Sequence, residues 1–570
     1  MLGDKSMSFD SEEPSVHPDL AKHQDSMKPE IFTLNGKIHT AFGYSIVNCT
    51  LIEGDDSCIL VDTMTSLDRA EIVAAEFKKI TDKPIKTIIY THFHADHVSG
   101  TTAFVTEDEI KSGVEVIGQE ELVDHVMRDV GLIAPILGRR AMYQFGMRLP
   151  IGQDGTVGAG LGPPQRPGKR SFVPPNKTFV DLYKGTTGGI KFEIHLIPSE
   201  TEDQCAVWLP DYKVLLSADA VYESFPNVYA LRGTRFRNPM TWAKGIDRLR
   251  EFSAEILIPH HGRPVEGAKK VDALLVDYRD AIQYLHDQTL RYMNKGFTAD
   301  EIKEIVVMPE HLRNHPWLGE FYGSYKHAIP AIFVGYLGWY QGDPVELDPI
   351  PWREKALRYI KLMGGRETLL TTAKEALNSG DVQWAGELLT WLIRANLDDS
   401  EACALKAEAL RRWAYKQKNA TWRNWGLTSS MELDGELDTA GGGMVLGSPE
   451  QVNGFPLVNI MEVMTVRLKA EDALDDHIRV TFQTSDTKEE CALEIRRGVC
   501  QFYRDPPADY DARVTFSRKS LLDWIFTKST FDEAVQSGGI SVEGEVAKVE
   551  HFLSKFEPFN QSDKVSIAAR

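Results

Sequence analysis

Residues 88–100 constrain the fold of this chain more than any other segment. They read Ile-Ile-Tyr-Thr-His-Phe-His-Ala-Asp-His-Val-Ser-Gly, an apolar run that leads directly into three histidines and one aspartate. His92 and His94 stand two positions apart, so on an extended backbone both imidazoles point to the same side. Asp96 and His97 follow after the expected turn. The segment therefore predicts a strand that ends in a metal site, with donors for two ions.

The donor types favour a catalytic metal. Neutral imidazole and carboxylate suit a borderline cation such as zinc, and catalytic zinc keeps one coordination position open for water. Two such ions a few Å apart can activate a shared water at neutral pH. A lone histidine on an apolar face is usually a packed core residue. Three histidines and an aspartate between His92 and His97 are too specific for that interpretation.

Three later segments offer further donors, each after an apolar run. Residues 194–200 end in Glu200, residues 214–219 end in Asp219, and His261 precedes a glycine after residues 256–259. A single carboxylate at a strand end is often only a solvated turn residue. The shared position after apolar runs makes the set a stronger candidate than any one member. The sequence leaves open Glu202 and Asp203 as alternatives to Glu200, and His260 as an alternative to His261.

Length and charge limit the class of protein. At 570 residues the chain is too long for one hydrophobic core and should divide into about three domains. A net charge of −19 argues against a nucleic-acid partner, which requires a basic surface. No apolar run is long enough for a membrane span, and the polar start lacks a secretory signal, so a cytoplasmic protein is expected. The six scattered cysteines indicate free, mostly buried thiols.

The pattern along the chain predicts five parts. A flexible segment (1–28) precedes a domain of short strands and helices (29–267), followed by a helical domain (268–430), a linker around three glycines (431–450) and a small α/β domain (451–560). In the first domain, strands are expected at 31–34, 44–52 and 58–63, and helices at 67–80 and 119–130. In the last, a helix is expected at 457–473 and strands at 478–482, 491–495 and 540–544. The Gly/Pro-rich stretch 152–175 is a candidate functional loop.

The motif at 92–97 and the order of the later donors resemble the metallo-β-lactamase superfamily. Over residues 30–560 the chain resembles its zinc-dependent alkyl sulfatase family, and more specific markers stand at 157–162, 231–237 and 336–340. The resemblance implies an α/β fold class: an αββα metallo-β-lactamase sandwich, an all-α dimerisation domain and a small α/β sterol-carrier-like domain. A helical hairpin at 373–398 cannot bury its own apolar face, which also implies a partner surface.

The resemblance assigns roles to the donors. It implies two Zn²⁺ ions per chain, one held by His92, His94 and Glu200, the other by Asp96, His97 and His261. Asp219 would bridge the two ions, where the family usually has a glutamate.

The same resemblance implies a site for the substrate. Arg232 and Arg237 would clamp the sulfate, because a guanidinium fork suits bidentate oxyanion binding. His327 falls where the family has a histidine near the substrate and is the candidate proton donor to the leaving group. Phe145 and Met147 depart from the family, which has a tyrosine and an asparagine there. The hydrogen bonds that the family's tyrosine and asparagine can make to a charged group would each be worth about 1 kcal/mol or more.

The function implied is zinc-dependent hydrolysis of a sulfate ester that carries an apolar alkyl tail, giving alcohol and sulfate by a metal-activated water. The protein would act as a homodimer on a small amphiphilic substrate, without nucleic acid or a membrane span. Two alternatives stay open. One is another hydrolase of the same fold that acts on a phosphoester, a lactone or a thioester. The other is a non-catalytic lipid-binding protein, suggested by the carrier-like last domain.

Overall fold

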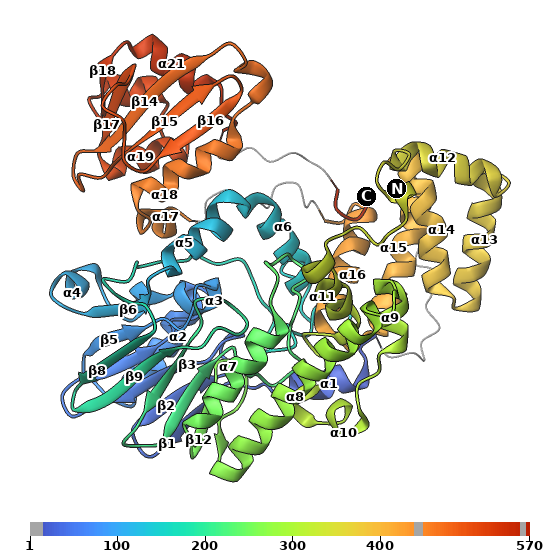
Figure 1. Cartoon of the computed structure of the whole chain (residues 1–570), viewed down its shortest axis with the longest axis horizontal. Coiled ribbons are helices and arrows are strands. Elements are labelled where there is room, and N and C mark those ends of the chain that lie inside the picture. The colour runs from blue at the N-terminus through green and yellow to red at the C-terminus, as the bar shows by residue number, and fades with distance from the viewer. Residues whose placement is uncertain (1–14, 438–447, 559–565, 570) are drawn as a thin grey trace, which may run out of the picture.

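The computed structural model describes residues 15–437, 448–558 and 566–569. Within these ranges a two-sheet domain is followed by a helical region and a small α/β domain (Figure 1). This order confirms the predicted fold class. The predicted domain boundaries stay a prediction, and the glycines expected in the linker lie outside the described residues.

Two sheets form the first domain. In the described residues, one runs in the order β1-β2-β3-β4-β5-β6-β7, antiparallel up to β4 and parallel from β4 onward. The other runs in the order β13-β12-β11-β10-β9-β8. The bounds of the first sheet are β1 (Glu30–Leu34), β2 (Ile38–Phe42), β3 (Cys49–Glu53), β4 (Cys58–Val61), β5 (Ile85–Ile89), β6 (Glu115–Gln119) and β7 (Lys177–Phe179). Those of the second are β8 (Leu182–Thr187), β9 (Ile190–Leu196), β10 (Cys205–Leu209), β11 (Val214–Ala218), β12 (Ile256–Pro259) and β13 (Val265–Glu266).

The sheets pack face to face through one apolar core. Ile89 and Ile117 from the first sheet and Val207, Leu216 and Ile258 from the second are fully buried in the same cluster. Burial of each such side chain contributes about 1.5–3 kcal/mol. Because this core fixes the two sheets against each other, the loops that follow their strands are held at a common edge.

Helices cover both outer faces, which completes an αββα sandwich. Helix α2 (Leu67–Lys78) buries Ala70, Val73 and Phe77, spaced three and four apart, on the first sheet. Helix α7 (Pro239–Glu251) and the long helix α8 (Ala268–Met293) pack on the second. The other helices of this domain are α3 (Ala95–Val98), α4 (Glu107–Lys111), α5 (Leu122–Met127) and α6 (Ala134–Phe145).

Two expectations for the first domain need correction. The strand predicted at 44–52 begins only at Cys49, and β2 was not predicted, because buried His39 and Thr40 interrupt its apolar run. Residues 15–28, expected to be flexible, contain helix α1 (Pro18–Asp25). Its Leu20 is fully buried in a small apolar cluster that also includes Phe321.

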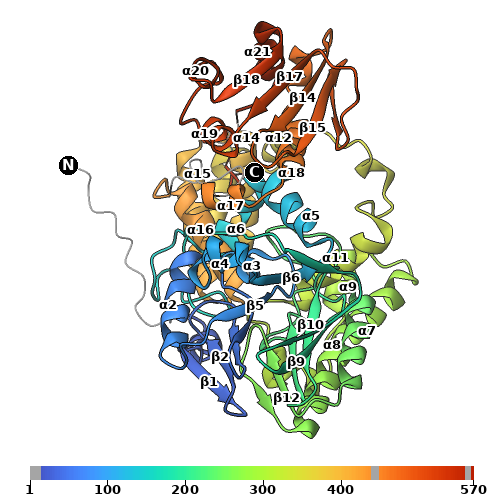
Figure 2. The ribbon, with the colours of Figure 1, turned by 90° about the vertical axis from the view of Figure 1, so that its left-hand side faces the viewer.

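The helical region follows α8 and stands beside the sandwich (Figures 1 and 2). Its helices are α9 (Ala299–Ile305), α10 (Glu310–Arg313), α11 (Tyr325–Leu337), α12 (Trp352–Leu362), α13 (Arg366–Ser379), α14 (Val382–Ala395), α15 (Ser400–Tyr415) and α16 (Ala420–Leu433). Helices α13 to α15 share a core that contains Leu370, Leu389 and Ala402. The predicted helical hairpin is thus formed by α13 and α14.

An apolar surface is left uncovered at 334–362, from the last turn of α11 through α12. Within these residues Leu337, Trp339, Val345 and Leu362 are between 60% and 82% exposed. A contiguous set of large exposed apolar side chains marks an interaction surface. We refer to residues 334–362 as the apolar arm.

The small C-terminal domain contains a sheet of order β16-β15-β14-β17-β18 in the described residues. Its elements are β14 (His477–Thr484), β15 (Glu490–Arg496), β16 (Val499–Tyr503), β17 (Ala512–Phe516), β18 (Ile540–Gly544), α17 (Pro449–Asn453), α18 (Leu457–Glu462), α19 (Arg518–Ile525), α20 (Phe531–Gln536) and α21 (Val546–Ser554). The single helix predicted at 457–473 is instead α18 followed by short 3₁₀ turns.

No helix in the described ranges has both the length and the apolar character that a membrane crossing needs. All six cysteines are free, and four of them are buried, as the sequence indicated.

Candidate metal centre and substrate site

The seven predicted metal ligands come together in two adjacent groups. The ligand atoms of His92, His94, Glu200 and Asp219 lie within 4.8 Å of one another, and so do those of Asp96, His97 and His261. Asp219 links the groups, because its Oδ2 lies 3.0 Å from Nε2 of His261 and 3.7 Å from Nε2 of His92. The structure thus offers two neighbouring metal sites with one carboxylate between them.

Five of the seven donors lie in loops that follow strands, and Asp96 and His97 lie in the short helix α3. His92 and His94 follow β5, Glu200 lies between β9 and β10, Asp219 directly follows β11, and His261 follows β12. Ala218 adopts a left-handed φ of 48° at the end of β11. This conformation is unfavourable for a residue with a Cβ and is typical of functional sites. It turns the chain so that Asp219 reaches the donors from β5.

Asp62, which the sequence analysis did not single out, contacts the ligand His97 on the side of its Nδ1. It lies directly after β4, and its Oδ2 is 2.6 Å from Nδ1 of His97. The backbone N–H and hydroxyl of Thr91 also donate to its carboxylate, at 2.8 and 2.7 Å. Such a carboxylate fixes the ring orientation and tautomer of a ligating histidine. Its signal in the sequence is its position at the end of an apolar run.

His260 approaches this supporting carboxylate rather than the ligands. Its Nε2 lies 3.2 Å from Oδ2 of Asp62, whereas His261 is the histidine grouped with Asp96 and His97. Neither Glu202 nor Asp203, the two alternatives to Glu200, belongs to the donor groups of the described residues. Glu202 is exposed and pairs with Arg235, and Asp203 is buried with its pKa raised to about 7 by desolvation.

Two observations show that the donors suit a metal. Nε2 of His97 and Oδ1 of Asp219 are buried without a hydrogen-bond partner in the described residues. Leaving such atoms unsatisfied costs about 1–3 kcal/mol each, which coordination would offset. The set also contains only imidazole and carboxylate, which suit zinc.

The electrostatics of the centre reflect its crowding. Burial lowers the pKa of His92 to about 3, so its imidazole is neutral and able to bind a cation. Burial raises the pKa of Glu200 to about 8, although the charge of Arg237 opposes this shift. Burial also opposes protonation of His261, but the charge of Asp219 outweighs it and raises that pKa to about 9.

The two predicted arginines lie at the centre but differ in their contacts. Arg237 is buried, and its Nη1 donates to Glu200 and to the carbonyl oxygen of Asn227, while its Nη2 has no partner in the described residues. Nη2 of Arg232 lies 3.4 Å from Nε2 of His94. No carboxylate in the described ranges pairs with Arg232, so its charge is available to an anion.

Helix α6 holds the loop that carries Arg232. The side-chain oxygen of Gln144 accepts from the backbone N–H of Arg232 at 2.8 Å. Arg140 donates to the carbonyl oxygens of Leu231 and Arg232 at 2.6 and 2.7 Å. Gln144 and Arg140 thus position this arginine through its backbone and leave its guanidinium without a carboxylate partner in the described residues.

Phe145 and Met147 end α6, on either side of Gly146 with its left-handed φ of 58°. The ring of Phe145 lies 6.5 Å from that of Tyr322, and Met147 is half-buried. Phe145, one of the two apolar departures from the family, therefore faces Tyr322.

Tyr322, which the sequence did not single out, is linked to the metal donors through the ring of Tyr222. It is 7% exposed, and its ring lies 6.1 Å from that of Tyr222, which lies 6.1 Å from His261. Its hydroxyl makes no hydrogen bond within the described ranges. Burial raises its pKa to about 12, so the phenol keeps its proton at neutral pH and can donate.

His327 lies between Trp422 and Tyr229. Its Nδ1 accepts from Nε1–H of Trp422 at 2.9 Å, and its ring is 6.4 Å from that of Tyr229. Burial lowers its pKa to about 4, so the imidazole is neutral and its proton resides on Nε2. That buried Nε2 has no partner in the described residues. His327 is thus a hydrogen-bond donor that carries no charge at neutral pH.

A cavity borders the metal centre on the side of Glu200 and Arg237. Aromatic residues Phe93 and Phe236 form part of its wall, and Arg128 and His125 form another part. The remaining lining residues are Pro198, Ser199, Thr201, Glu202, Thr234, Arg235, Asn238 and Thr241. We call this cavity the Glu200 pocket.

Comparison with known families matches three consecutive parts of the chain. Residues 43–261 match the metallo-beta-lactamase superfamily, residues 298–436 the alkyl sulfatase dimerisation model, and residues 445–563 the alkyl sulfatase C-terminal model. The chain is 41% identical over 520 residues to a linear primary-alkylsulfatase of a Pseudomonas species, covering 89% of this chain and 98% of that one. It is 29% identical over 542 residues to an alkyl/aryl-sulfatase of Saccharomyces cerevisiae, covering 93% and 83%.

Solved structures agree over the full architecture. A stereoselective inverting sec-alkylsulfatase from a Pseudomonas species superposes with a TM-score of 0.90 at 28% identity, covering 98% of this chain and 89% of that one. The chain belongs to the alkyl sulfatase family of the metallo-β-lactamase superfamily.

Proposed function

We propose that this chain is an alkyl sulfatase that hydrolyses sulfate esters with an apolar tail, using two zinc ions. The observation that carries the proposal is the pair of donor groups joined by Asp219, with the unpaired guanidinium of Arg232 beside His94. Hydrolysis adds one water across the ester linkage and releases an alcohol and sulfate.

His92, His94 and Glu200 would hold one zinc, and Asp96, His97 and His261 the other, with Asp219 between them. When bound, zinc supplies a Lewis acid and lowers the pKa of a coordinated water. Asp62 keeps Nδ1 of His97 hydrogen-bonded, so Nε2 is the ring nitrogen that would bind the ion. Arg237 holds Glu200 in a fixed orientation through its Nη1.

The sulfate would be bound by Arg232 and by the free Nη2 of Arg237. Both donors carry a delocalised positive charge, Arg237 in a buried and Arg232 in a half-buried position, where charge-assisted hydrogen bonds are strong. They stabilise the negative charge that stays on the sulfate group as the ester bond breaks. Phe145 and Met147 add no polar contact, so these two arginines carry most of the recognition.

Neutral His327 would donate a hydrogen bond from Nε2 to the oxygen of the leaving alcohol. Trp422 fixes its tautomer, because Nδ1 already accepts from the indole N–H. Its low pKa means that a charged imidazolium does not form at neutral pH. The role therefore rests on hydrogen bonding and orientation.

A substrate panel tests this function. Zinc-loaded protein should release sulfate from primary or secondary alkyl sulfates, and zinc-free protein should not. Phosphodiesters and lactones at equal zinc are the comparison. Turnover of a lactone or phosphodiester, with alkyl sulfates intact, would contradict the proposal.

We further propose a homodimer in which the apolar arm of each chain packs on a second copy. The arm lies within the dimerisation match, and its Trp339 is 64% exposed. Trp339→Asp should shift the mass measured by light scattering from dimer to monomer. Val180→Asp, at an exposed apolar residue outside the arm, is the control. A wild-type monomer at micromolar concentration would refute the dimer.

A further inference from the structure

The wall of the Glu200 pocket has the C-terminal domain behind it. Helix α5 is followed by one π-helical turn, η2 (Arg128–Leu132), and together they form a thin layer. One side of this layer lines the pocket, and the other side packs on α18 and its following turn. Short π-helical turns are rare and often mark functional sites.

On the pocket side, Arg128 and His125 are organised around Phe93 of the metal-binding loop. The Arg128 guanidinium carbon lies 5.2 Å from the centre of the Phe93 ring, and the His125 ring centre lies 5.3 Å from it. Nη1 of Arg128 is 3.2 Å from Nδ1 of His125. Phe93 is flanked by the ligands His92 and His94, so this wall directly adjoins the metal centre.

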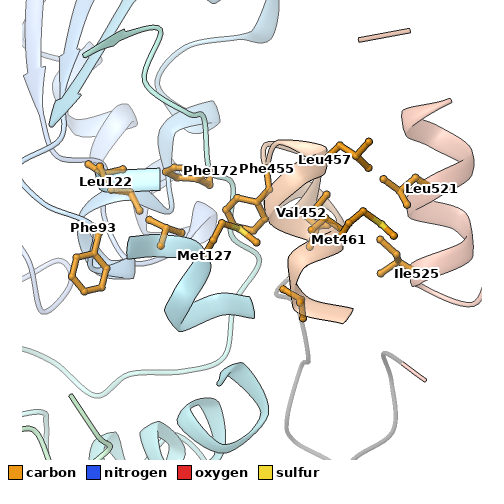
Figure 3. Close-up of a cluster of buried hydrophobic side chains, with 14 of the residues drawn as sticks. Phe93, Leu122, Met127, Phe172, Val452, Phe455, Leu457, Met461, Leu521 and Ile525 are labelled. Atoms are coloured by element: carbon orange, nitrogen blue, oxygen red, sulfur yellow. The ribbon is translucent and has the colours of Figure 1, made fainter. Parts of the chain in front are cut away.

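On the other side, apolar residues of both domains form one continuous cluster. Figure 3 shows Leu122 and Met127 from α5 next to Phe172 and Phe455, with Met461 behind them toward α19. The rings of Phe172 and Phe455 are 5.4 Å apart. A hydrogen bond from Nδ2 of Asn459 to Asp124 at 3.1 Å adds a polar contact.

Gly131 of η2 lies directly against Val463 of the C-terminal domain. A Cβ added to Gly131 would stand 2.6 Å from Cγ2 of Val463 but 4.0 Å from its Cβ. A side chain at position 131 therefore does not fit unless Val463 becomes smaller. The two residues form a matched pair that fixes how near η2 lies to the C-terminal domain.

We infer that the C-terminal domain completes the substrate site: by packing on α5 and η2 it positions Arg128 against Phe93, in a pocket wall that binds the organic part of the substrate. This inference rests on the proposed function. The pocket is lined by Glu200 and by Arg237, whose Nη2 has no partner in the described residues, and we place in it the organic part of a sulfate bound at Arg237. Gly131 and Val463 are positioning residues, and Arg128 determines specificity.

Gly131→Ala tests the inference, with Gly138→Ala as a matched control. Both glycines lie in helical turns, but a Cβ at position 138 would meet nothing within 4 Å. We expect Gly131→Ala to raise KM for decyl sulfate on the order of tenfold with little change in kcat, because the wall binds ground state and transition state alike. Zinc content and inhibition by inorganic sulfate should stay unchanged. Gly138→Ala should behave as wild type.

The double variant Gly131→Ala/Val463→Ala provides the decisive readout. Removing the Val463 methyl groups leaves ordinary contact distance to the new Cβ, so KM should return toward the wild-type value. Hydrogen exchange in residues 122–132 should rise in the single variant and fall again in the double variant. A merely destabilised Gly131→Ala would contain less active enzyme, which lowers the apparent kcat and leaves KM unchanged.

Two results would overturn the inference: an unchanged KM in Gly131→Ala, or a raised KM that Val463→Ala fails to restore. These are distinct from failure of the proposed function, in which wild-type protein hydrolyses no alkyl sulfate at all.

Discussion

The metal centre and the Glu200 pocket adjoin each other, yet they are assembled from different kinds of contact. The seven donors lie in one domain, in loops and one short helix that follow strands of two sheets with a shared core. The pocket wall combines the metal loop, α5 with η2, and the loop that carries Phe236, and the C-terminal domain packs behind it. The ends of strands thus position the metal donors, whereas the pocket wall depends on packing between distant parts of the chain.

This difference predicts that substitution of a metal donor abolishes most of the activity, whereas substitutions around the centre lower activity or metal affinity by smaller factors. Asp219→Ala should lower kcat by about a thousandfold or more, because it removes the carboxylate shared by both donor groups. Sulfate release and metal analysis of the same preparation would measure it. Near-normal turnover in Asp219→Ala would show that the two groups do not act as one centre.

Loss of the free guanidinium should have the next largest effect. Arg232→Ala should lower kcat/KM by about a hundredfold, since one charge-stabilising donor in a buried site is worth that much. Arg232→Lys should recover little of it, because an ammonium lacks the planar fork. Steady-state kinetics decide the matter, with the surface variant Arg250→Ala as control. A fully active lysine variant would contradict bidentate binding.

The supporting carboxylate should affect metal affinity more than chemistry. Asp62→Asn keeps the shape but removes the charge that orients His97, so zinc affinity should fall about tenfold to a hundredfold. Competition with a chromophoric chelator measures this. Asp56→Asn, in the exposed turn before the same strand, should leave affinity unchanged. An unchanged zinc affinity in Asp62→Asn would show that Asp62 does not support the metal ligands.

The smallest of these effects on activity is expected for Tyr322, which we place near the substrate. Tyr322→Phe should lower kcat/KM about tenfold, the value of one hydrogen bond to a charged group. Phe145→Tyr in that background should restore part of the loss, because its ring stacks on Tyr322 and would supply a new hydroxyl. Tyr325→Phe is the neighbouring control. Unchanged kinetics in Tyr322→Phe would mean that the phenol does not reach the substrate.

The same comparison explains what the sequence could predict. The ligands were predictable because each follows an apolar strand, and His92 to His97 stand within one short segment. Asp62 was overlooked since it is 35 positions from its partner His97 and looks like any strand-end carboxylate. Tyr322 and Gly131 carry no local pattern, because their roles arise from contacts with Phe145 and Val463 that only the folded chain creates.

The secondary structure shows the same limit. Strands with continuous apolar runs, such as β4 and β11, were predicted within a few residues. β2 was missed because buried His39 and Thr40 look polar in sequence. Helix α1 was missed because only the packing of Leu20 against the helical region stabilises a short polar segment.

A zinc titration of metal-free protein tests the central claim most directly. Sulfate release from decyl sulfate should rise with added zinc, level off at two ions per chain, and vanish when a chelator removes them. Activity that is complete without metal, or that levels off below one ion per chain, would contradict a two-metal hydrolytic centre.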